Sequence, residues 1–439
     1  MMETTNFYRR SYIAASDFID HHSKLLWSLL LAIQFLLPFP FVATHKDIPD
    51  EDAYQNLAQN IVDHHAYFLN WTAFHEASGQ PNTYYAPAWP AVLAAGYAIV
   101  HRPIGFWVAS GIVWCICLTM VWMLGRSLGL NPIALWMLLA WFSTNPLYAY
   151  YHLHLMTETL GITIATAILA IGMRYVKQPS WQLACALGAL AGLGQLTRTA
   201  LLFPFIAVWI VFFARPFRLR FSFAALSLAT YLAVVSPWLV RMHSVNAGFS
   251  STELKLGQNL FLYNYPKVNN PYKIRSDEHI EFPPGLEQMT PAKRDALLTR
   301  YGVAEIVNYP TKYVRNCLRR AFYLLSPLPN FYTSSFRVAA ALVCITLLYL
   351  FMPWAVVISL LLKGAARVTT SEAILLTAIL IWYLFHILLH GSIRQRLPSD
   401  LWVAALAISM CQRFGGSILP AAVRSNVSSE LAPQPSGTP

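Results

Sequence analysis

The sequence predicts an all-α polytopic membrane protein with a bundle of about ten transmembrane helices. Of its 439 residues, 56% are hydrophobic and only 12% are charged, whereas a soluble domain usually carries about 25% charged residues. The mean hydropathy of +0.45 indicates that much of the apolar surface faces lipid. A soluble enzyme does not fit this composition.

Charge and cysteine content argue against two further classes of protein. The net charge is +11, but the basic residues occur singly between apolar runs and form no stripe that would bind nucleic acid. The six cysteines show no CxxC pair and lie mostly within apolar segments. They therefore predict neither a disulfide framework nor a zinc site.

Transmembrane spans need roughly 20 apolar residues each. The run at 25–43 follows about 24 mostly polar residues, too many for an ordinary signal peptide, so it is interpreted as an uncleaved first span. An eleventh run, 86–100, begins with Pro87 and Pro90 and predicts a helix at or dipping into the outer interface. The ten candidate spans are 25–43, 105–125, 131–149, 158–174, 180–196, 200–214, 221–240, 338–361, 373–390 and 399–412.

Two outer segments are large enough to carry juxtamembrane helices. Amphipathic spacing after Pro49 predicts one helix in the first outer loop. The stretch YVRNCLRRAFYLL in the second outer loop predicts an interfacial helix. The predicted organisation is a cytoplasmic N-terminus (1–24), a transmembrane module (25–241) with its first outer loop at 44–104, a large outer loop (242–336), C-terminal spans (337–413) and a disordered cytoplasmic tail (414–439).

The distribution of basic residues predicts the orientation of the chain. With the amino terminus inside, every short cytoplasmic loop contains Lys or Arg. Any one basic residue on the opposite face could simply reach toward lipid headgroups. Several on one face indicate an anionic ligand, and six lie near span ends there: Lys46, Arg102, Arg198, Arg241, Arg394 and Arg396.

Acidic residues lie on the same predicted face. Asp50, Glu51 and Asp52 follow the first span, and two acids at a membrane surface can serve as general base and metal ligand. Asp52 is interpreted as a helix cap or a solvated residue. Glu158 opens a later span, where an ionisable group is a functional hypothesis, although it could instead cap that helix.

A divalent cation is one further hypothesis for this face. Asp50, Glu51 and Glu158 would supply the oxygen ligands that Mg²⁺ or Mn²⁺ prefers. His152 and His154 are spaced as metal ligands, but histidines among interfacial tyrosines also belong to aromatic belts. Both interpretations of the histidines stay open.

Four arginines are the candidate anion ligands: Arg198 in QLTRTALL, Arg241 in SPWLVRMHS, and Arg394 and Arg396 in GSIRQRLPSD. The planar guanidinium matches phosphate oxygens, and a buried arginine without an anion would be costly. The sequence therefore predicts a phosphate-binding site on the outer face.

The order of these segments resembles the GT-C superfamily, in particular the lipid-linked-sugar glycosyltransferases related to protein O-mannosyltransferases and the aminoarabinose transferase of lipid A. The resemblance covers about 45–265 and recurs near 390–400, and each motif is weak alone. The matching residues are Asp50, Glu51 and Tyr54 (DExxY), Thr157 and Glu158, Leu196 to Arg198 (LTR), Pro237, Trp238 and Arg241 (PWxxR), Gly257, Asn259 and Leu260 (GxNL), and Arg394, Arg396 and Pro398 (RxRxP).

The chain departs from the family pattern at three places. The first outer loop has Tyr84-Tyr85-Ala86-Pro87 where the family usually has Lys or Arg before a Pro-Pro pair, and Arg102 is an uncertain replacement. Met242 follows the PWxxR arginine in place of Asn. The large soluble carboxy-terminal domain of some relatives is absent.

The resemblance implies a GT-C-like bundle that transfers a sugar from a polyprenyl-phosphate donor to an acceptor hydroxyl, with inversion. It implies a bacterial inner membrane with the active site on the periplasmic or extracellular side. In this scheme Arg241, Arg394 and Arg396, with Arg198, bind the donor phosphate. Asp50 is the general base, and Glu51 and Glu158 orient the site or share a cation with it.

Other functions stay open at this point. A lipid or glycan transporter or flippase would also hold charged residues, although near mid-membrane and on repeated halves, and no repeat is evident. An O-antigen ligase or polymerase would use a pyrophosphate-linked donor, which the Asp-Glu motif disfavours. A scaffold without catalysis fits poorly with the paired acids. The acceptor could be lipid A, another glycan, a glycolipid or a protein.

Overall fold

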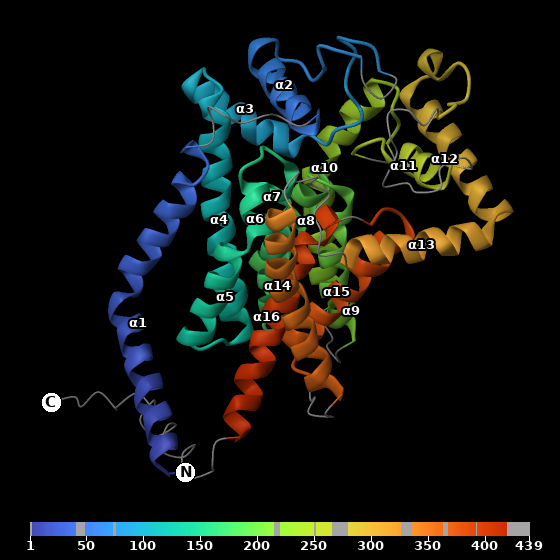
Figure 1. The fold of residues 1–439 in the computed structure, drawn as a ribbon. Coiled ribbons are helices and arrows are strands. Elements are labelled where there is room, and N and C mark those ends of the chain that lie inside the picture. Colours follow the sequence, from blue (N-terminus) through green and yellow to red (C-terminus); the bar gives the residue numbers. More distant parts are fainter. Residues whose placement is uncertain are drawn as a thin grey trace.

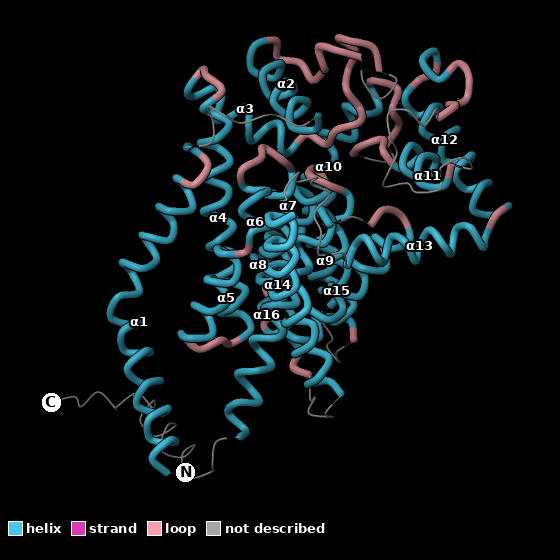
Figure 2. Tube along the Cα trace, in the orientation of Figure 1, coloured by secondary structure: helices cyan, strands magenta, loops and turns pink. Residues whose placement is uncertain are grey.

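The protein, seen in a computed structural model, is built almost entirely of helices (Figure 1). The structure describes residues 2–40, 49–72, 76–214, 220–249, 252–265, 280–325, 336–362, 368–391 and 393–418. Within these ranges the chain forms helices and loops (Figure 2), and an isolated β-bridge joins Phe68 to Pro81. The prediction of an all-α chain is confirmed there. Lys46 and the predicted disordered tail beyond 418 lie outside the described residues.

A helix lies in each of the ten predicted spans. Four helices are long and apolar enough to cross a membrane, so the chain is an integral membrane protein: α4 (Ile104–Leu128), α7 (Thr157–Lys177), α10 (Arg220–Ser244) and α15 (Thr370–Leu388). The other runs correspond to α1 (Met2–Leu36), α5 (Pro132–Thr144), α8 (Trp181–Gln195), α9 (Leu202–Phe213), α14 (Phe336–Leu362) and α16 (Ile393–Ile418). The eleventh run forms α3 (Ala88–Val100).

Two helix boundaries differ from the expected ones. The run at 131–149 is broken into α5 and α6 (Pro146–His152), because Asn145 is extended (φ −70°, ψ 117°) and its side chain caps Leu147 N. A residue before proline avoids the helical region, which explains the break. Helix α1 begins at Met2 rather than near 25, since no Gly or Pro interrupts its 35 residues.

The bundle has two unlike ends. Helices α2 (Pro49–Asp63), α3, α11 (Leu256–Asn264) and α12 (Pro291–Asn308) gather at the end drawn uppermost in Figure 1, here called the upper end. The start of α1 and the end of α16 lie at the lower end. The last turns of α4 and α7 also carry basic residues, Arg126 on α4 and Arg174 and Lys177 on α7.

Close packing of α8 on α10 depends on two glycines. A Cβ atom at Gly188 would overlap the carbonyl oxygen of Ser227, and one at Gly192 would lie 2.7 Å from Val234 Cβ. Small residues four apart let two helix backbones approach closely in a membrane. This contact fixes the direction of α8, which ends at Gln195, three residues before Arg198.

Helix α13 (Pro310–Leu325) runs across the bundle instead of along it (Figure 1). Its polar face packs on α11, because Lys312 Nζ donates to Tyr265 O at 2.9 Å and Arg320 Nη2 donates to Asn264 Oδ1 at 3.1 Å. Arg320 Nη1 also donates to Leu388 O at 2.6 Å, where α15 ends. The opposite face is exposed and apolar: Val314, Leu318 and Phe322. The predicted amphipathic helix is therefore present, crosswise at the end of a span.

Candidate functional site

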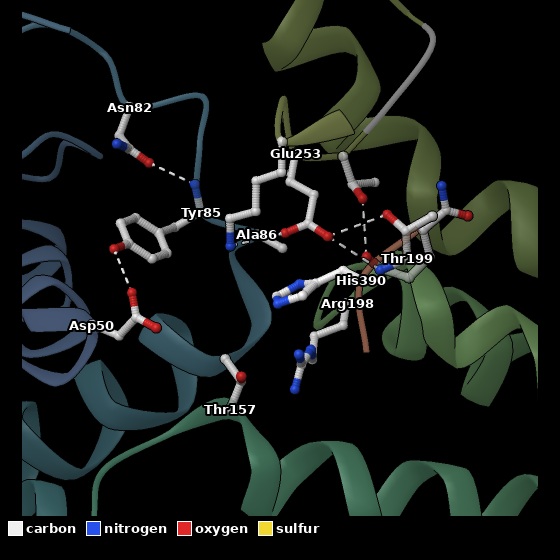
Figure 3. A network of polar contacts seen from close by, with 12 residues as sticks. Asp50, Asn82, Tyr85, Ala86, Thr157, Arg198, Thr199, Glu253 and His390 are labelled. Carbon is white, nitrogen blue, oxygen red and sulfur yellow. Dashed lines mark hydrogen bonds and ion pairs between the residues drawn. The ribbon is translucent and has the colours of Figure 1, made fainter. Parts of the chain in front are cut away.

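A buried carboxylate at the start of α7 organises the upper end. Glu158 is 2% exposed and lies in the first turn of the helix, after Met156 in an extended conformation. Its Oε1 atom accepts a hydrogen bond from Arg198 Nη1 at 2.7 Å and another from Arg394 Nε. Two guanidinium groups compensate this buried charge, which would otherwise be very costly. Figure 3 shows Arg198 extending toward the start of α7 at Thr157.

Arg394 connects Glu158 to a second carboxylate. Its Nη1 atom lies 2.6 Å from Asp50 Oδ2, in the first turn of α2. The other oxygen, Asp50 Oδ1, accepts a hydrogen bond from the hydroxyl of Tyr85 at 3.0 Å (Figure 3). Three segments distant in sequence, at the starts of α2, α7 and α16, thus meet through one arginine. The term acid–arginine cluster is used below for Asp50, Glu158, Arg198 and Arg394.

The charges of this cluster determine the protonation of Asp50. Burial by itself raises the pKa of the Asp50 carboxyl, but the charges of Arg394 and Lys255 and hydrogen bonds from Arg394 and Tyr85 lower this pKa to about 2. Burial and the charge of Asp50 raise the pKa of Tyr85, which therefore stays protonated and donates. Asp50 is consequently an anion at neutral pH.

Three hydrogen bonds hold the segment 252–255, which precedes α11, beside the cluster. Thr252 Oγ1 donates to Gln195 O at 2.9 Å, and Trp238 Nε1 donates to Thr252 O at 2.9 Å. Leu254 N donates to Thr83 O, also at 2.9 Å. These contacts attach the segment to the end of α8, to α10 and to the first outer loop.

This segment presents an ion pair to the site. Glu253 Oε1 accepts from the backbone N and the hydroxyl of Thr199, both at 3.3 Å (Figure 3). Lys255 Nζ lies 3.3 Å from Glu253 Oε2 and 4.7 and 4.6 Å from the ring centres of Tyr84 and Tyr85. Sequence reasoning missed both Lys255 and Tyr85. Two features of the sequence could have indicated them: the lysine two residues before the glycine of GxNL, and the tyrosine pair in the first outer loop, where the chain departs from the family pattern.

Glu51 faces another part of the structure, although it adjoins Asp50 in sequence. It is fully buried, and its Oε1 accepts from Leu155 N at 2.8 Å while its Oε2 lies 3.0 Å from His154 Nδ1. Glu51 therefore attaches α2 to the segment that precedes α7. His152 lies elsewhere again, with Nε2 2.7 Å from Gln34 O and its ring stacked on Trp114.

These positions do not form a common ligand set for a metal. In the part of the chain that the structure describes, no three His, Cys, Asp or Glu residues are grouped to hold a metal ion. Asp50 and Glu158 share Arg394, a cation already in place, and Glu51 faces the α6–α7 segment. The divalent cation at these acids stays a prediction.

Two predicted phosphate ligands make other contacts. Arg241 donates to Asn82 O at 2.7 Å and Tyr67 O at 3.3 Å, and lies over the Trp238 ring. Arg396 is wholly buried, with Nε 2.8 Å from Asp400 Oδ2 and Nη1 2.9 Å from Leu324 O. Of the four predicted arginines, the structure thus brings Arg198 and Arg394 together with the acids. Arg102 is exposed between α3 and α4.

The cluster remains accessible to a ligand. The side chains of Asp50, Arg394 and Arg198 are 35%, 24% and 26% exposed, whereas Glu158 beneath them is covered. A small cavity of about 20 Å³ adjoins the cluster between α7 and the α15–α16 pair, and its lining includes Glu158, Arg198, Trp382, His386, Arg394 and Gln395. The arrangement can bind an anion on two arginines and hold a proton acceptor beside it.

The chain is similar in structure to several solved structures, two of which are crystal structures of one protein. No family model matches the chain, and no curated protein is similar to it in sequence. The crystal structure of ArnT from Cupriavidus metallidurans bound to undecaprenyl phosphate is similar over 93% of this chain and 81% of that one, with 13% identity and a TM-score of 0.43. The crystal structure of the same protein in the apo state is similar over 96% and 82%, with 14% identity and a TM-score of 0.41.

Proposed function

We propose that this protein is a membrane glycosyltransferase that moves a sugar from a polyprenyl-phosphate donor to an acceptor hydroxyl at the upper end of the bundle. The observation that carries the proposal is the acid–arginine cluster. It places an accessible carboxylate, Asp50, in contact with Arg394, while the buried Glu158 holds Arg394 and Arg198 in place. The resemblance of the motifs to the GT-C superfamily supports the same chemistry.

The arginines suit the leaving group of this reaction. When the bond between the sugar and the phosphate breaks, negative charge grows on the phosphate oxygens of the lipid. Cationic donors fixed beforehand stabilise that charge more in the transition state than in the ground state. Glu158 holds these cationic donors in position, because its Oε1 atom accepts hydrogen bonds from both guanidinium groups.

Asp50 is suited to act as the general base for the nucleophile, which is the acceptor hydroxyl. The acceptor hydroxyl loses its proton as it attacks the anomeric carbon, and general-base catalysis of such a step typically contributes ~10² to 10⁴ in rate. A base that acts on the acceptor and an arginine that binds the departing phosphate suit attack by the hydroxyl from the face opposite the phosphate. A single displacement of this kind inverts the configuration at the anomeric carbon.

The position in the membrane suits a lipid-linked donor. The cluster lies where α7 begins, so a phosphate bound there places its hydrocarbon tail beside the spans. The basic residues in the last turns of α4 and α7 support a cytoplasmic lower end, because positive charge is enriched at the cytoplasmic ends of spans. The proposed site then faces the periplasm of a bacterial inner membrane.

The test uses the purified full chain in lipid nanodiscs. It is incubated with polyprenyl-phosphate sugars of several kinds and with lipid A, glycolipid, glycan and peptide acceptors, and both donor loss and glycosylated product are quantified. We expect one donor to be consumed with formation of product of inverted configuration. Movement of intact donor across proteoliposomes, without cleavage of any donor, would instead identify a transporter.

A further inference from the structure

Lys255 is held differently from the arginines of the cluster. Arg394 contacts two carboxylates and Arg198 contacts one at 2.7 Å, whereas Lys255 has a longer ion pair of 3.3 Å with Glu253. Its ammonium otherwise lies against the faces of Tyr84 and Tyr85. A lysine side chain is flexible, and its ammonium lacks the rigid planar donor geometry of a guanidinium. The group can therefore turn toward a new partner without moving the backbone.

Glu253 does not depend on Lys255 for its hydrogen bonds. It also accepts from the backbone N and the hydroxyl of Thr199. If the ammonium turned away, the carboxylate would keep both of these donors. The backbone of the segment would also stay in place, because Thr252 and Leu254 attach it independently. Release of Lys255 from Glu253 is therefore cheap compared with release of Arg394 from Glu158.

The charge of Lys255 already acts on the cluster. Burial lowers its pKa, but nearby negative charge, that of Glu253 first and that of Asp50 as well, raises the pKa, so the group is a cation at neutral pH. The charge of Lys255 is in turn one of the causes that lower the pKa of Asp50. Tyr85, whose ring centre lies 4.6 Å from the Lys255 ammonium, donates to Asp50, so the ammonium is positioned beside any anion bound between Asp50 and Arg394.

We infer that Lys255 is a phosphate ligand of the donor site, whose ammonium turns from Glu253 to the phosphate as charge develops there. The inference rests on the proposed function and adds a residue to it. The sugar-linked phosphate is a diester with one negative charge, and the lipid phosphate that leaves is a monoester with up to two. A cation that can move binds the monoester better than the diester, which favours cleavage.

Equilibrium binding to the full chain in nanodiscs tests this inference with three probes: undecaprenyl phosphate, its singly charged methyl ester, and uncharged undecaprenol. At pH 8, we expect Lys255→Met to weaken binding of undecaprenyl phosphate by at least ~10-fold and binding of the methyl ester by much less. Binding of undecaprenol should not change. Lys255→Arg should restore most of the preference for the monoester.

The control is Lys293→Met, which removes an exposed lysine on α12 and should bind all three lipids as the wild type does. Thermal unfolding of each variant shows whether it is folded. If folded Lys255→Met keeps the wild-type preference for the monoester, Lys255 is not a phosphate ligand and the proposed function stands. If the wild type itself does not prefer undecaprenyl phosphate to undecaprenol, the proposed function and this inference both fail.

Discussion

Asp50 is the residue on which the proposed chemistry depends most directly. Asp50→Asn keeps the size and some hydrogen bonding of the side chain, but it cannot take a proton from the acceptor. We expect transfer to fall by at least ~10²-fold, the low end of general-base contributions, while undecaprenyl phosphate still binds. Steady-state assays on the purified variant measure this. Near-normal turnover by Asp50→Asn, together with an inactive Glu51→Gln variant, would show that the base is the other carboxylate.

The same aspartate should also respond to acid. Its folded-state pKa of about 2 lies below the ordinary value of 3.8, so its ion pair stabilises the fold above pH 3.8 and is lost as pH falls toward 2. We expect the unfolding temperature of the wild type to drop over this window and that of Asp50→Asn to drop less. Asp52→Asn is the matched control, since Asp52 is exposed on the same helix. Equal acid sensitivity of Asp50→Asn and wild type would contradict the ion pair.

For single residues, the sequence predicts which residue types belong to the site better than it predicts which side chains contact one another. Acids and arginines next to span ends were recognisable, and Asp50, Glu158, Arg198 and Arg394 indeed meet. The sequence could not reveal that Glu51 turns to Leu155, because adjacent residues on a helix point about 100° apart and only the tertiary neighbours decide which faces the site. Lys255 was missed because it lies outside the recognised motifs and comes close to the site only in the folded chain.

Among the elements, the contact of α8 with α10 sets the position of Arg198. Gly188→Ala would push a methyl group into the Ser227 carbonyl, and overpacking of this kind typically costs ~1 to 3 kcal/mol. We expect a lower unfolding temperature and slower transfer, since Arg198 follows the end of α8. Gly161→Ala is the control, because its Cβ would meet nothing nearer than Leu201 Cδ1 at 3.9 Å. Unchanged stability of Gly188→Ala would show that the two helices can separate without cost.

Element positions were largely predictable because apolar runs of span length have few alternatives to helix in a membrane. The predicted helix boundaries are wrong where a local sequence signal competes with the hydropathy pattern. Asn145 before Pro146 breaks an otherwise continuous apolar run, and the polar residues before 25 extend α1 because no helix breaker intervenes. The burial of each span was not predictable, since it depends on which helices pack around it.

On the scale of the whole molecule, the two ends should face different compartments. In a cysteine-free background, we expect Asp52→Cys and Lys293→Cys, both exposed at the upper end, to react with a membrane-impermeant thiol reagent from the periplasmic side. Gln178→Cys, exposed just beyond the basic end of α7, should react only after the membrane is opened. Reaction of Asp52→Cys and Gln178→Cys from one side would refute the arrangement of α2 and α7 across a bilayer.

The bridge that Arg394 makes between Asp50 and Glu158 predicts a compulsory order of substrate binding. While Arg394 pairs with Asp50, the carboxylate is too weak a base to accept a proton from a hydroxyl. A donor phosphate that takes over the Nη1 atom of Arg394 removes this partner and makes Asp50 more basic. The acceptor should therefore bind productively only second. In steady-state inhibition studies, added lipid phosphate should compete with the donor and not with the acceptor.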